Sequence, residues 1–257
     1  MNYSIHPFPS HPSIRDAYPD IRRALATKTP TLDSKAIPNA DLLDATVNAL
    51  RDISSPFHVS HCHENAGDLH ISITAATGGH EVSTGDQIRG GLFIQNSESC
   101  RFDTLICTRI YRVVCDNGML TECEKEQVFE LKQSDQPPAD YAMAVGHVVA
   151  RSFNETALVY DYRRFKSTEN EILVTPFEFL CNLAAQNLIT DDEQSIIQTI
   201  FNENADFTLY GLLNAVTQSA HDYRASDQWI RAFQIERLAG EILRGDHNLP
   251  SYSRVYS

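Results

Sequence analysis

The hydrophobic periodicity of this chain changes near residue 137, and that change constrains the fold more than any other feature. From 57 to 131, apolar residues largely alternate with polar ones, as in FHVSHCHE and LHISITAA, which is typical of strands with one buried face. From 137 onward they recur at helical spacing, most clearly in SDQWIRAFQIERLAGEILRG. Strands followed by helices predict an α+β fold.

The alternating region divides into about five strands of a mainly antiparallel meander. The polar connector NAGD joins the first two strands in a hairpin, in which His63 pairs with His70. The third strand, QIRGGLFIQ, contains Gly90-Gly91, which indicates a bulge or a close backbone approach. RFDTLICTRIYRVVC is expected to form a long fourth strand, and MLTECEKEQVFEL is expected to return as the fifth.

Two connections in this meander have recognisable turn chemistry. Asn96-Ser97-Glu98-Ser99 is expected to join the third and fourth strands, with Asn and Ser side chains bonding the backbone of the turn. Asn117-Gly118 is a strong hairpin signal, because both central residues of a type I′ turn need positive φ. Cys115 then faces Leu120 at a strand end. No sequence feature supplies a base for Cys115, so we interpret it as a small buried residue.

The rest of the chain divides into an arm and helices. Residues 1–38 hold six of the 11 prolines and are expected to form an irregular N-terminal arm. Residues 39–136 form a helix plus the meander, with Asn39 or Asp41 as the helix cap. Residues 137–257 form a helical region packed on the sheet of one compact domain. Its expected helices are 139–153, 154–166, 176–187, 191–203, 207–223 and 226–245, the last with Ser226 as N-cap and Gly245 as C-cap.

Composition restricts the classes of partner. The formal net charge of −13 argues against broad, nonspecific attraction to nucleic acid or anionic membrane. No apolar run approaches the ~18 residues that a membrane span requires, and no signal peptide is visible at the N-terminus. We therefore expect a cytoplasmic protein without a membrane partner, whose six cysteines are reduced.

Three histidines of the first hairpin suggest a metal site. His61 and His63 share one strand face, and His70 lies across from His63. Three imidazoles arranged in this way can hold zinc and leave one position open. The alternative is a solvated polar face, since Leu69, Ile71 and Ile73 supply the core on the other side.

Cations and aromatic residues occur together in VYDYRRFK, residues 159–166. Stacking rings with phosphate-binding cations are what single-stranded nucleic acid requires. The alternative is an amphipathic helix with core aromatics. Arg109 and Arg112 lie on opposite faces of the long strand and could add phosphate contacts. The candidate nucleic-acid-binding residues are Arg109, Arg112, Tyr160, Tyr162, Arg163, Arg164 and Lys166.

The segment from Gly85-Asp86 to Asn117-Gly118 resembles the phage- and plasmid-borne family catalogued as domain of unknown function 932. The matching residues are Gly85, Asp86, Asn96, Ser97, Arg112, Cys115, Asn117 and Gly118, joined later by Asn214, Ala215, Thr217 and His221 in TLYGLLNAVTQSAH. Cys100 stands where the family usually has Gly, and Asp116 where Thr is common. The resemblance implies a mobile genetic element as the setting, where DNA recombination and counter-defence proteins are abundant.

Three functions remain open at this level. The first is a non-catalytic protein that handles nucleic acid by single-stranded DNA binding or annealing, because the element order is similar in outline to single-strand annealing proteins, which form oligomeric rings. This reading implies a homo-oligomer. The second is an acidic effector, such as a counter-defence factor, that binds a host protein. The third is a zinc-dependent enzyme built on His61, His63 and His70, so the sequence leaves enzyme status open.

Overall fold

In the computed structural model, this α+β chain divides into two compact units. Unit 1 consists of Met1–His80, Arg89–Tyr111 and Glu122–Leu158, and unit 2 of Glu81–Ile88, Arg112–Thr121 and Val159–Ser257. Each unit draws on separated segments, so the unit boundaries do not coincide with the expected boundaries at 38 and 136. The structure describes residues 2–3, 13–27, 36–53, 56–83, 86–112, 117–120, 128–132, 135, 137–153, 155–226, 228–245, 249–250 and 254–256.

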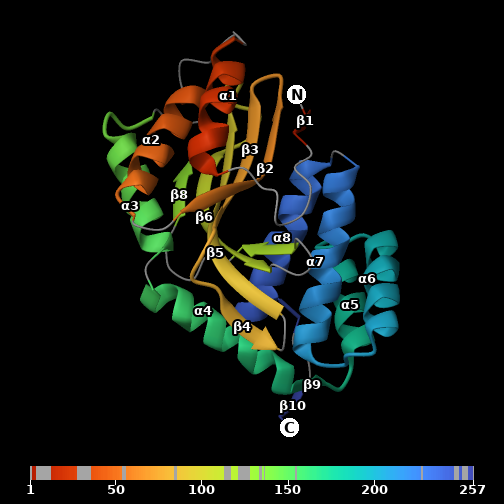
Figure 1. The fold of residues 1–257 in the computed structure, drawn as a ribbon. Coiled ribbons are helices and arrows are strands. Elements are labelled where there is room, and N and C mark those ends of the chain that lie inside the picture. Colours follow the sequence, from red (N-terminus) through yellow and green to blue (C-terminus); the bar gives the residue numbers. More distant parts are fainter. Residues whose placement is uncertain are drawn as a thin grey trace. The chain divides into compact units, whose positions relative to one another are not determined.

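The sheet of unit 1 is the predicted antiparallel meander (Figure 1). Its strands neighbour one another in the order β1-β2-β3-β5-β6, with β8 also paired to β6. Two short strands with residues in unit 2 were not predicted separately: β4 (His80–Ser83), which pairs with β5, and β7 (Asn117–Leu120). The strands of the meander are β1 (Asn2–Tyr3), β2 (Phe57–Asn65), β3 (Asp68–Ala75), β5 (Asp86–Ser97), β6 (Thr104–Arg112) and β8 (Val128–Leu131).

The first hairpin has the predicted register with a tighter turn. Asn65 pairs with Asp68, which leaves Ala66 and Gly67 as a two-residue turn. Their φ values of 50° and 88° are both positive, as a type I′ turn requires. His63 therefore pairs directly with His70, as predicted.

The predicted turn at Asn117-Gly118 is only partly reproduced. β6 pairs with β8 through Thr104 opposite Leu131 and Cys107 opposite Val128. These are the same residue pairs that a hairpin with Asn117 and Gly118 as its two turn residues would form. The two residues themselves begin strand β7, so the expectation that they form the turn is wrong. The connection before them, 113–116, lies outside the described residues, as do Cys115 and the segment 121–127 with Cys123.

Three helices pack against one face of the unit 1 sheet: α1 (Ile14–Thr27), α2 (Asn39–Arg51) and α3 (Tyr141–Ser152) (Figure 1). In α2, the spacing of Leu42, Val47 and Leu50 places apolar side chains on the inward side. All three are less than 5% exposed, and burying each contributes about 1.5–3 kcal/mol. Their partners across the interface include Leu69, Ile71, Ile73, Leu92, Ile94, Val145 and Val149.

Helix α1 corrects the expectation of an irregular N-terminal arm. The prolines of this region suggested irregular structure, yet α1 accommodates Pro19 within the helix. Ile21 and Leu25, four residues apart, bury their side chains in the core and offset the hydrogen bond that Pro19 cannot make. Arg22 also pairs with Asp44 of α2 at 2.9 Å, which holds the two helices together.

Unit 2 contains the predicted C-terminal helices. Helix α4 (Glu155–Ser167) begins in unit 1 and continues into unit 2, where a 3-10 turn, η2 (Thr168–Asn170), follows it. Strand β9 (Glu171–Leu173) pairs antiparallel with β10 (Arg254–Tyr256). None of the described helices combines the length and apolar character needed to span a bilayer. The remaining helices are α5 (Pro176–Ala185), α6 (Asp191–Asn204), α7 (Leu209–Ala225) and α8 (Trp229–Arg244).

For helix α8, the sequence predicted a buried stripe, an N-cap and a C-cap, which can each be compared with the structure. The predicted stripe is confirmed, because Ala232, Ile235, Ala239 and Ile242 are all at most 1% exposed. Gly245 ends the helix with a φ of 70°, as a C-cap glycine does. The predicted N-cap is wrong: Ser226 is the C-cap that follows α7, and Gln228 precedes α8.

Candidate functional site

The second face of the unit 1 sheet carries an unusual number of buried polar side chains. Alternation along β2 and β3 places His63 and His70 on the face opposite Leu69 and Ile71. His63 is only 7% exposed and His70 only 4%. The alternative of a solvated polar face is therefore wrong, because both faces of this sheet are buried.

Aromatic rings surround His70. The centroid of its imidazole lies 6.3 Å from that of His63, 6.2 Å from Phe93 and 5.3 Å from Phe102. Burial lowers the pKa of His70 from 6.5 to about 4, and the neighbouring His63 contributes in the same direction. His70 is consequently neutral at pH 7, and its ring packs as a part of the core.

The predicted zinc site is not assembled among the described residues. His61 pairs with Ser72 beyond a bulge that shifts the register after Val59. Within the described part of the chain, no three His, Cys, Asp or Glu side chains are grouped so that they could hold a metal ion. The zinc hypothesis for His61, His63 and His70 therefore rests on the sequence pattern alone.

Arg109 lies inside unit 1 on the same sheet. Its side chain is 1% exposed, and its Nη1 donates a hydrogen bond to Ser72 Oγ at 2.5 Å. The guanidinium also lies 5.6 Å from the centroid of the Tyr111 ring, a cation–π distance. Arg109 is thus away from the surface where we expected it to contact phosphate. The side chain of Arg112 lies outside the described residues.

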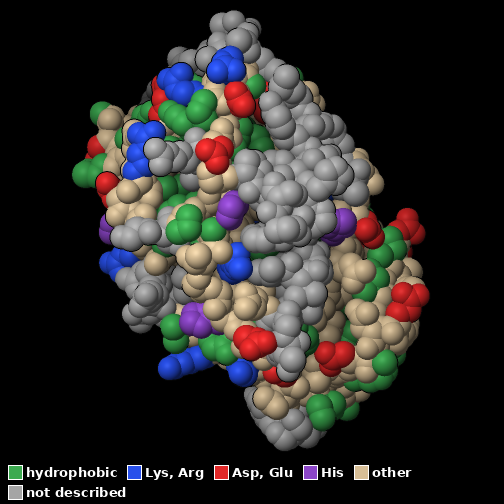
Figure 2. Space-filling view, viewed as in Figure 1, with side chains coloured by type: hydrophobic (Ala, Val, Ile, Leu, Met, Phe, Trp, Pro, Cys, Tyr) green, Lys and Arg blue, Asp and Glu red, His purple; other side chains and the backbone are tan. Residues whose placement is uncertain are grey.

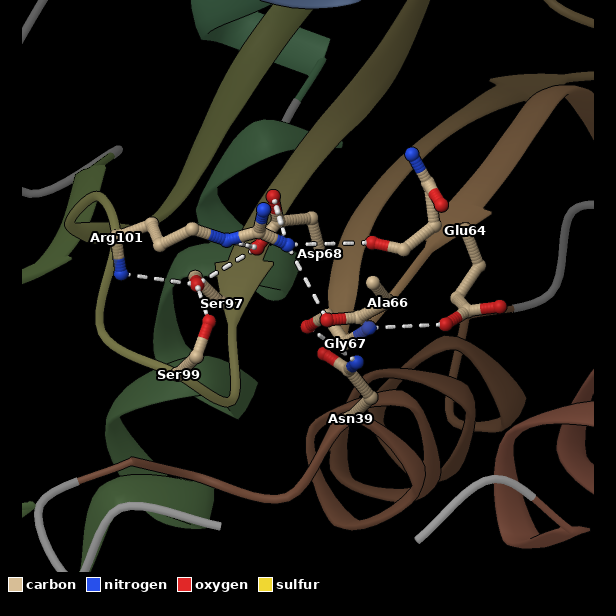
Figure 3. A network of polar contacts seen from close by, with 9 residues as sticks. Asn39, Glu64, Ala66, Gly67, Asp68, Ser97, Ser99 and Arg101 are labelled. Carbon is tan, nitrogen blue, oxygen red and sulfur yellow. Dashed lines mark hydrogen bonds and ion pairs between the residues drawn. The ribbon is translucent and has the colours of Figure 1, made fainter. Parts of the chain in front are cut away.

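An extensive polar network joins the ends of three unit 1 strands (Figure 3). Ser97 Oγ donates to Asp68 at 2.7 Å and accepts from the Arg101 backbone N–H at 3.0 Å. The guanidinium of Arg101 pairs with Asp68 at 2.7 Å and also donates to the Ala66 carbonyl at 3.2 Å. The expectation that Asn96 bonds the backbone of this turn is wrong, because its side chain donates to the Ile37 carbonyl and to Asn39 and accepts from Thr104. The contacts of Ser97 and Arg101 confirm the expectation for Ser97, which accepts from a backbone N–H of its own turn. They also tie that turn to the first hairpin.

The same network caps helix α2 from a distant part of the chain. Glu98 accepts a hydrogen bond from the Asn39 backbone N–H at 2.7 Å, so a carboxylate lies at the N-terminal end of the helix. Burial raises the pKa of Glu98, and the Asn39 N–H opposes that rise. The Asn39 side chain instead donates to the Gly67 carbonyl at 3.0 Å and accepts from Asn96 at 2.8 Å. The predicted local cap by Asn39 or Asp41 is therefore wrong.

On α4, the predicted nucleic-acid residues divide into exposed ones and half-buried ones that bond other elements of unit 2. Arg163 and Lys166 are exposed. Arg164 instead pairs with Glu171 and donates to the Leu243 carbonyl at 2.7 Å, which ties α4 to β9 and α8. Tyr162 donates its hydroxyl hydrogen to the Glu81 carbonyl at 2.8 Å. The side chain of Tyr160 lies outside the described residues.

Sequence reasoning missed the surface formed by α5, α6 and the adjoining residues of unit 2. From 167 to 223 the chain contains nine Asp or Glu and no Lys or Arg. Five of the seven large hydrophobic side chains described as exposed fall between 172 and 207. Figure 2 shows acidic and apolar side chains next to one another over α5 and α6. We call these residues the acidic surface: Ile172, Val174, Phe177, Glu178, Asp191, Asp192, Ile196, Glu203 and Phe207.

Three phenylalanines form the aromatic centre of this surface. Phe201 is fully buried, and its ring makes edge contacts with Phe177 at 6.4 Å and Phe207 at 5.6 Å between centroids. Phe177 is nevertheless 37% exposed and Phe207 47%. We call Phe177, Phe201 and Phe207 the aromatic triplet. The absence of cations between 167 and 223 was the sequence signal that could have led to it.

No family model matches the chain, and the searches of curated proteins and of solved structures also gave no match. The likeness to the domain of unknown function 932 family therefore rests on the separated sequence motifs. Two of the matching residues, Asn96 and Ser97, belong to the polar network that joins the turns of unit 1. The side chains of both residues therefore have a structural role, because their hydrogen bonds join segments of unit 1.

Proposed function

We propose that this chain is a non-catalytic binding protein whose acidic surface binds a basic segment of a partner protein. The observation that carries the proposal is the combination of exposed apolar residues with carboxylates in a long stretch that lacks Lys and Arg. Exposed apolar residues bordered by polar ones mark interaction sites more often than single hydrophobic residues do. The carboxylates restrict the partner to basic chemistry.

The cations of unit 2 leave these carboxylates available. The described guanidinium groups of Arg164, Arg224 and Arg231 pair with Glu171, Glu236 and Glu193. By contrast, none of the acidic side chains of the acidic surface forms an ion pair within the described part of the chain. A basic partner would therefore not have to displace an internal cation.

The mobile-element setting implied by the sequence resemblance adds a biological role to this proposal. A counter-defence factor of a phage or plasmid, acting on a host protein, fits a binding surface of this kind. The mobile-element setting is supported by the sequence resemblance and the chemistry by the acidic surface. The net charge of −13 favours a cationic protein partner over a polyanion.

The proposal is tested with two fluorescent probes and the full chain. One is a synthetic peptide with leucine and lysine at helical spacing, and the other is a single-stranded oligonucleotide. We expect anisotropy to show binding of the peptide that weakens as salt is raised, because screening acts over about 8 Å at physiological ionic strength. Binding of the oligonucleotide without binding of the peptide would refute the proposal.

Charge reversal separates the acidic surface from general acidity. The double variant Glu178→Lys/Glu203→Lys changes the net charge by the same amount as the control Asp52→Lys/Glu130→Lys, whose two residues are exposed in unit 1. Only the first variant is expected to lose peptide binding. Equal losses in both variants would mean that net charge, and not the acidic surface, attracts the peptide.

A second candidate function is binding of single-stranded nucleic acid on α4. The supporting observation is that the exposed Lys166 has its Nζ 5.7 Å from the ring centroid of Tyr162, with Arg163 also exposed nearby on the helix. A mobility shift at low salt that is lost in Arg163→Ala/Lys166→Ala would support it. No shift at tens of micromolar protein would contradict it. The annealing-type homo-oligomer belongs to this candidate.

A further inference from the structure

We infer that the aromatic triplet is the anchor point of the acidic surface and that it holds an apolar residue of the partner, flanked by lysines or arginines. This inference rests on the proposed function, since it names where on that surface the partner binds. Every ring of the triplet has a carboxylate within two residues along the chain: Glu178 beside Phe177, Glu203 beside Phe201, and Asp206 beside Phe207.

The aromatic contacts give the anchor a rigid base. Phe201 is held in the core, and its edge contacts support the half-exposed rings of Phe177 and Phe207. The Phe207 backbone is also fixed, because its carbonyl accepts a hydrogen bond from the Leu173 N–H at 3.0 Å. Aromatic side chains held in this way lose little conformational freedom on binding, so they are effective anchors at interfaces.

The position of Glu203 gives an independent reason for a cationic partner. Glu203 lies in the last turn of α6, where the helix dipole disfavours a carboxylate, and this turn contains no basic residue. The two exposed aspartates at the start of α6, by contrast, complement the dipole and are accounted for by helix stability. Asp206 is likewise accounted for, because it accepts hydrogen bonds from Thr208 before α7. Glu203 is the carboxylate that has no such structural role, so we assign it the role of binding a cation of the partner.

The decisive variant is Glu203→Gln, which keeps the shape of the side chain and removes the charge. The probe is the leucine–lysine peptide, and the matched control is Glu130→Gln, an exposed acid on β8 in unit 1. We expect the dissociation constant to rise about fivefold for Glu203→Gln and to change less than about twofold for the control. The melting temperature of Glu203→Gln should stay equal to that of the parent or rise, because the dipole conflict is relieved.

The apolar part is tested with Phe207→Ser, compared with Ile230→Ser at an equally exposed position of α8 in the same unit. Phe207→Ser should weaken peptide binding about tenfold or more, and Ile230→Ser less than about twofold. If Phe207→Ser fails to fold, Glu203→Gln still decides the question. Salt-dependent peptide binding that neither variant weakens would overturn the anchor while leaving the proposed function intact. Absence of peptide binding to the parent would overturn both.

Discussion

Lowering the pH should destabilise the folded chain through His70. The folded state holds this imidazole at a pKa of about 4, against 6.5 for an ordinary histidine, chiefly because burial disfavours its charged form. The unfolded chain therefore takes up the proton first as the pH falls. The stability loss begins near pH 6.5 and is complete near pH 4, and His70 contributes nothing to the pH dependence above this window.

The magnitude follows from the two pKa values. Their difference corresponds to about 3 kcal/mol in total, at about 1.4 kcal/mol for each pH unit. At about pH 5 the unfolded imidazole is almost fully protonated and the folded one almost neutral, so about 2 kcal/mol is lost. For a chain of this size that loss lowers the melting temperature by about 4–8 °C.

The assay compares urea unfolding of the parent and of His70→Gln at about pH 7.5 and about pH 5. The parent should lose about 2 kcal/mol more between these conditions than His70→Gln does, because glutamine does not titrate. His147→Gln, which removes an exposed histidine of α3 in the same unit, serves as the control and should lose as much as the parent. Equal pH losses in the parent and His70→Gln would refute the reasoning.

Four further single substitutions and one double variant test the framework of the fold by chemical denaturation. Cys100→Gly should raise the free energy of unfolding by about 0.5–1 kcal/mol, because Cys100 holds a φ of 51° that glycine adopts without strain; a lower stability would contradict this. Gly91→Ala should cost about 2 kcal/mol or more, since a Cβ there would lie 2.4 Å from the Ile73 carbonyl oxygen. Gly146→Ala, inside α3 with room for a methyl group, should be neutral or stabilising, and the reverse order of the two glycine variants would show that close approach is not the cause. Arg224→Met should cost about 3–5 kcal/mol by leaving Glu236 buried without its cation, and adding Glu236→Met should restore most of that loss. A double variant as unstable as Arg224→Met would argue against the buried charge as the cause.

The sequence by itself determined the features that depend on residues close together along the chain. Alternation and the polar connector NAGD predicted the first hairpin and placed His63 opposite His70, because the position of the connector fixes the register of both strands. Helical spacing predicted α2 and the buried stripe of α8. The close approach of backbone at Gly91 was one of the two alternatives that the glycine pair predicted.

The tertiary structure decided what each face of those elements meets. A strand pattern shows which residues share a face, but it does not show whether a further layer covers the polar side. The alternating pattern of the sequence therefore did not indicate that His70 and Arg109 are buried. The cap of α2 could not be predicted for the same reason, because Glu98 reaches Asn39 from 59 residues away. The aromatic triplet likewise depends on ring contacts between separate elements. The sequence indicated the acidic character of the segment that contains the three rings, and only packing brought the rings together.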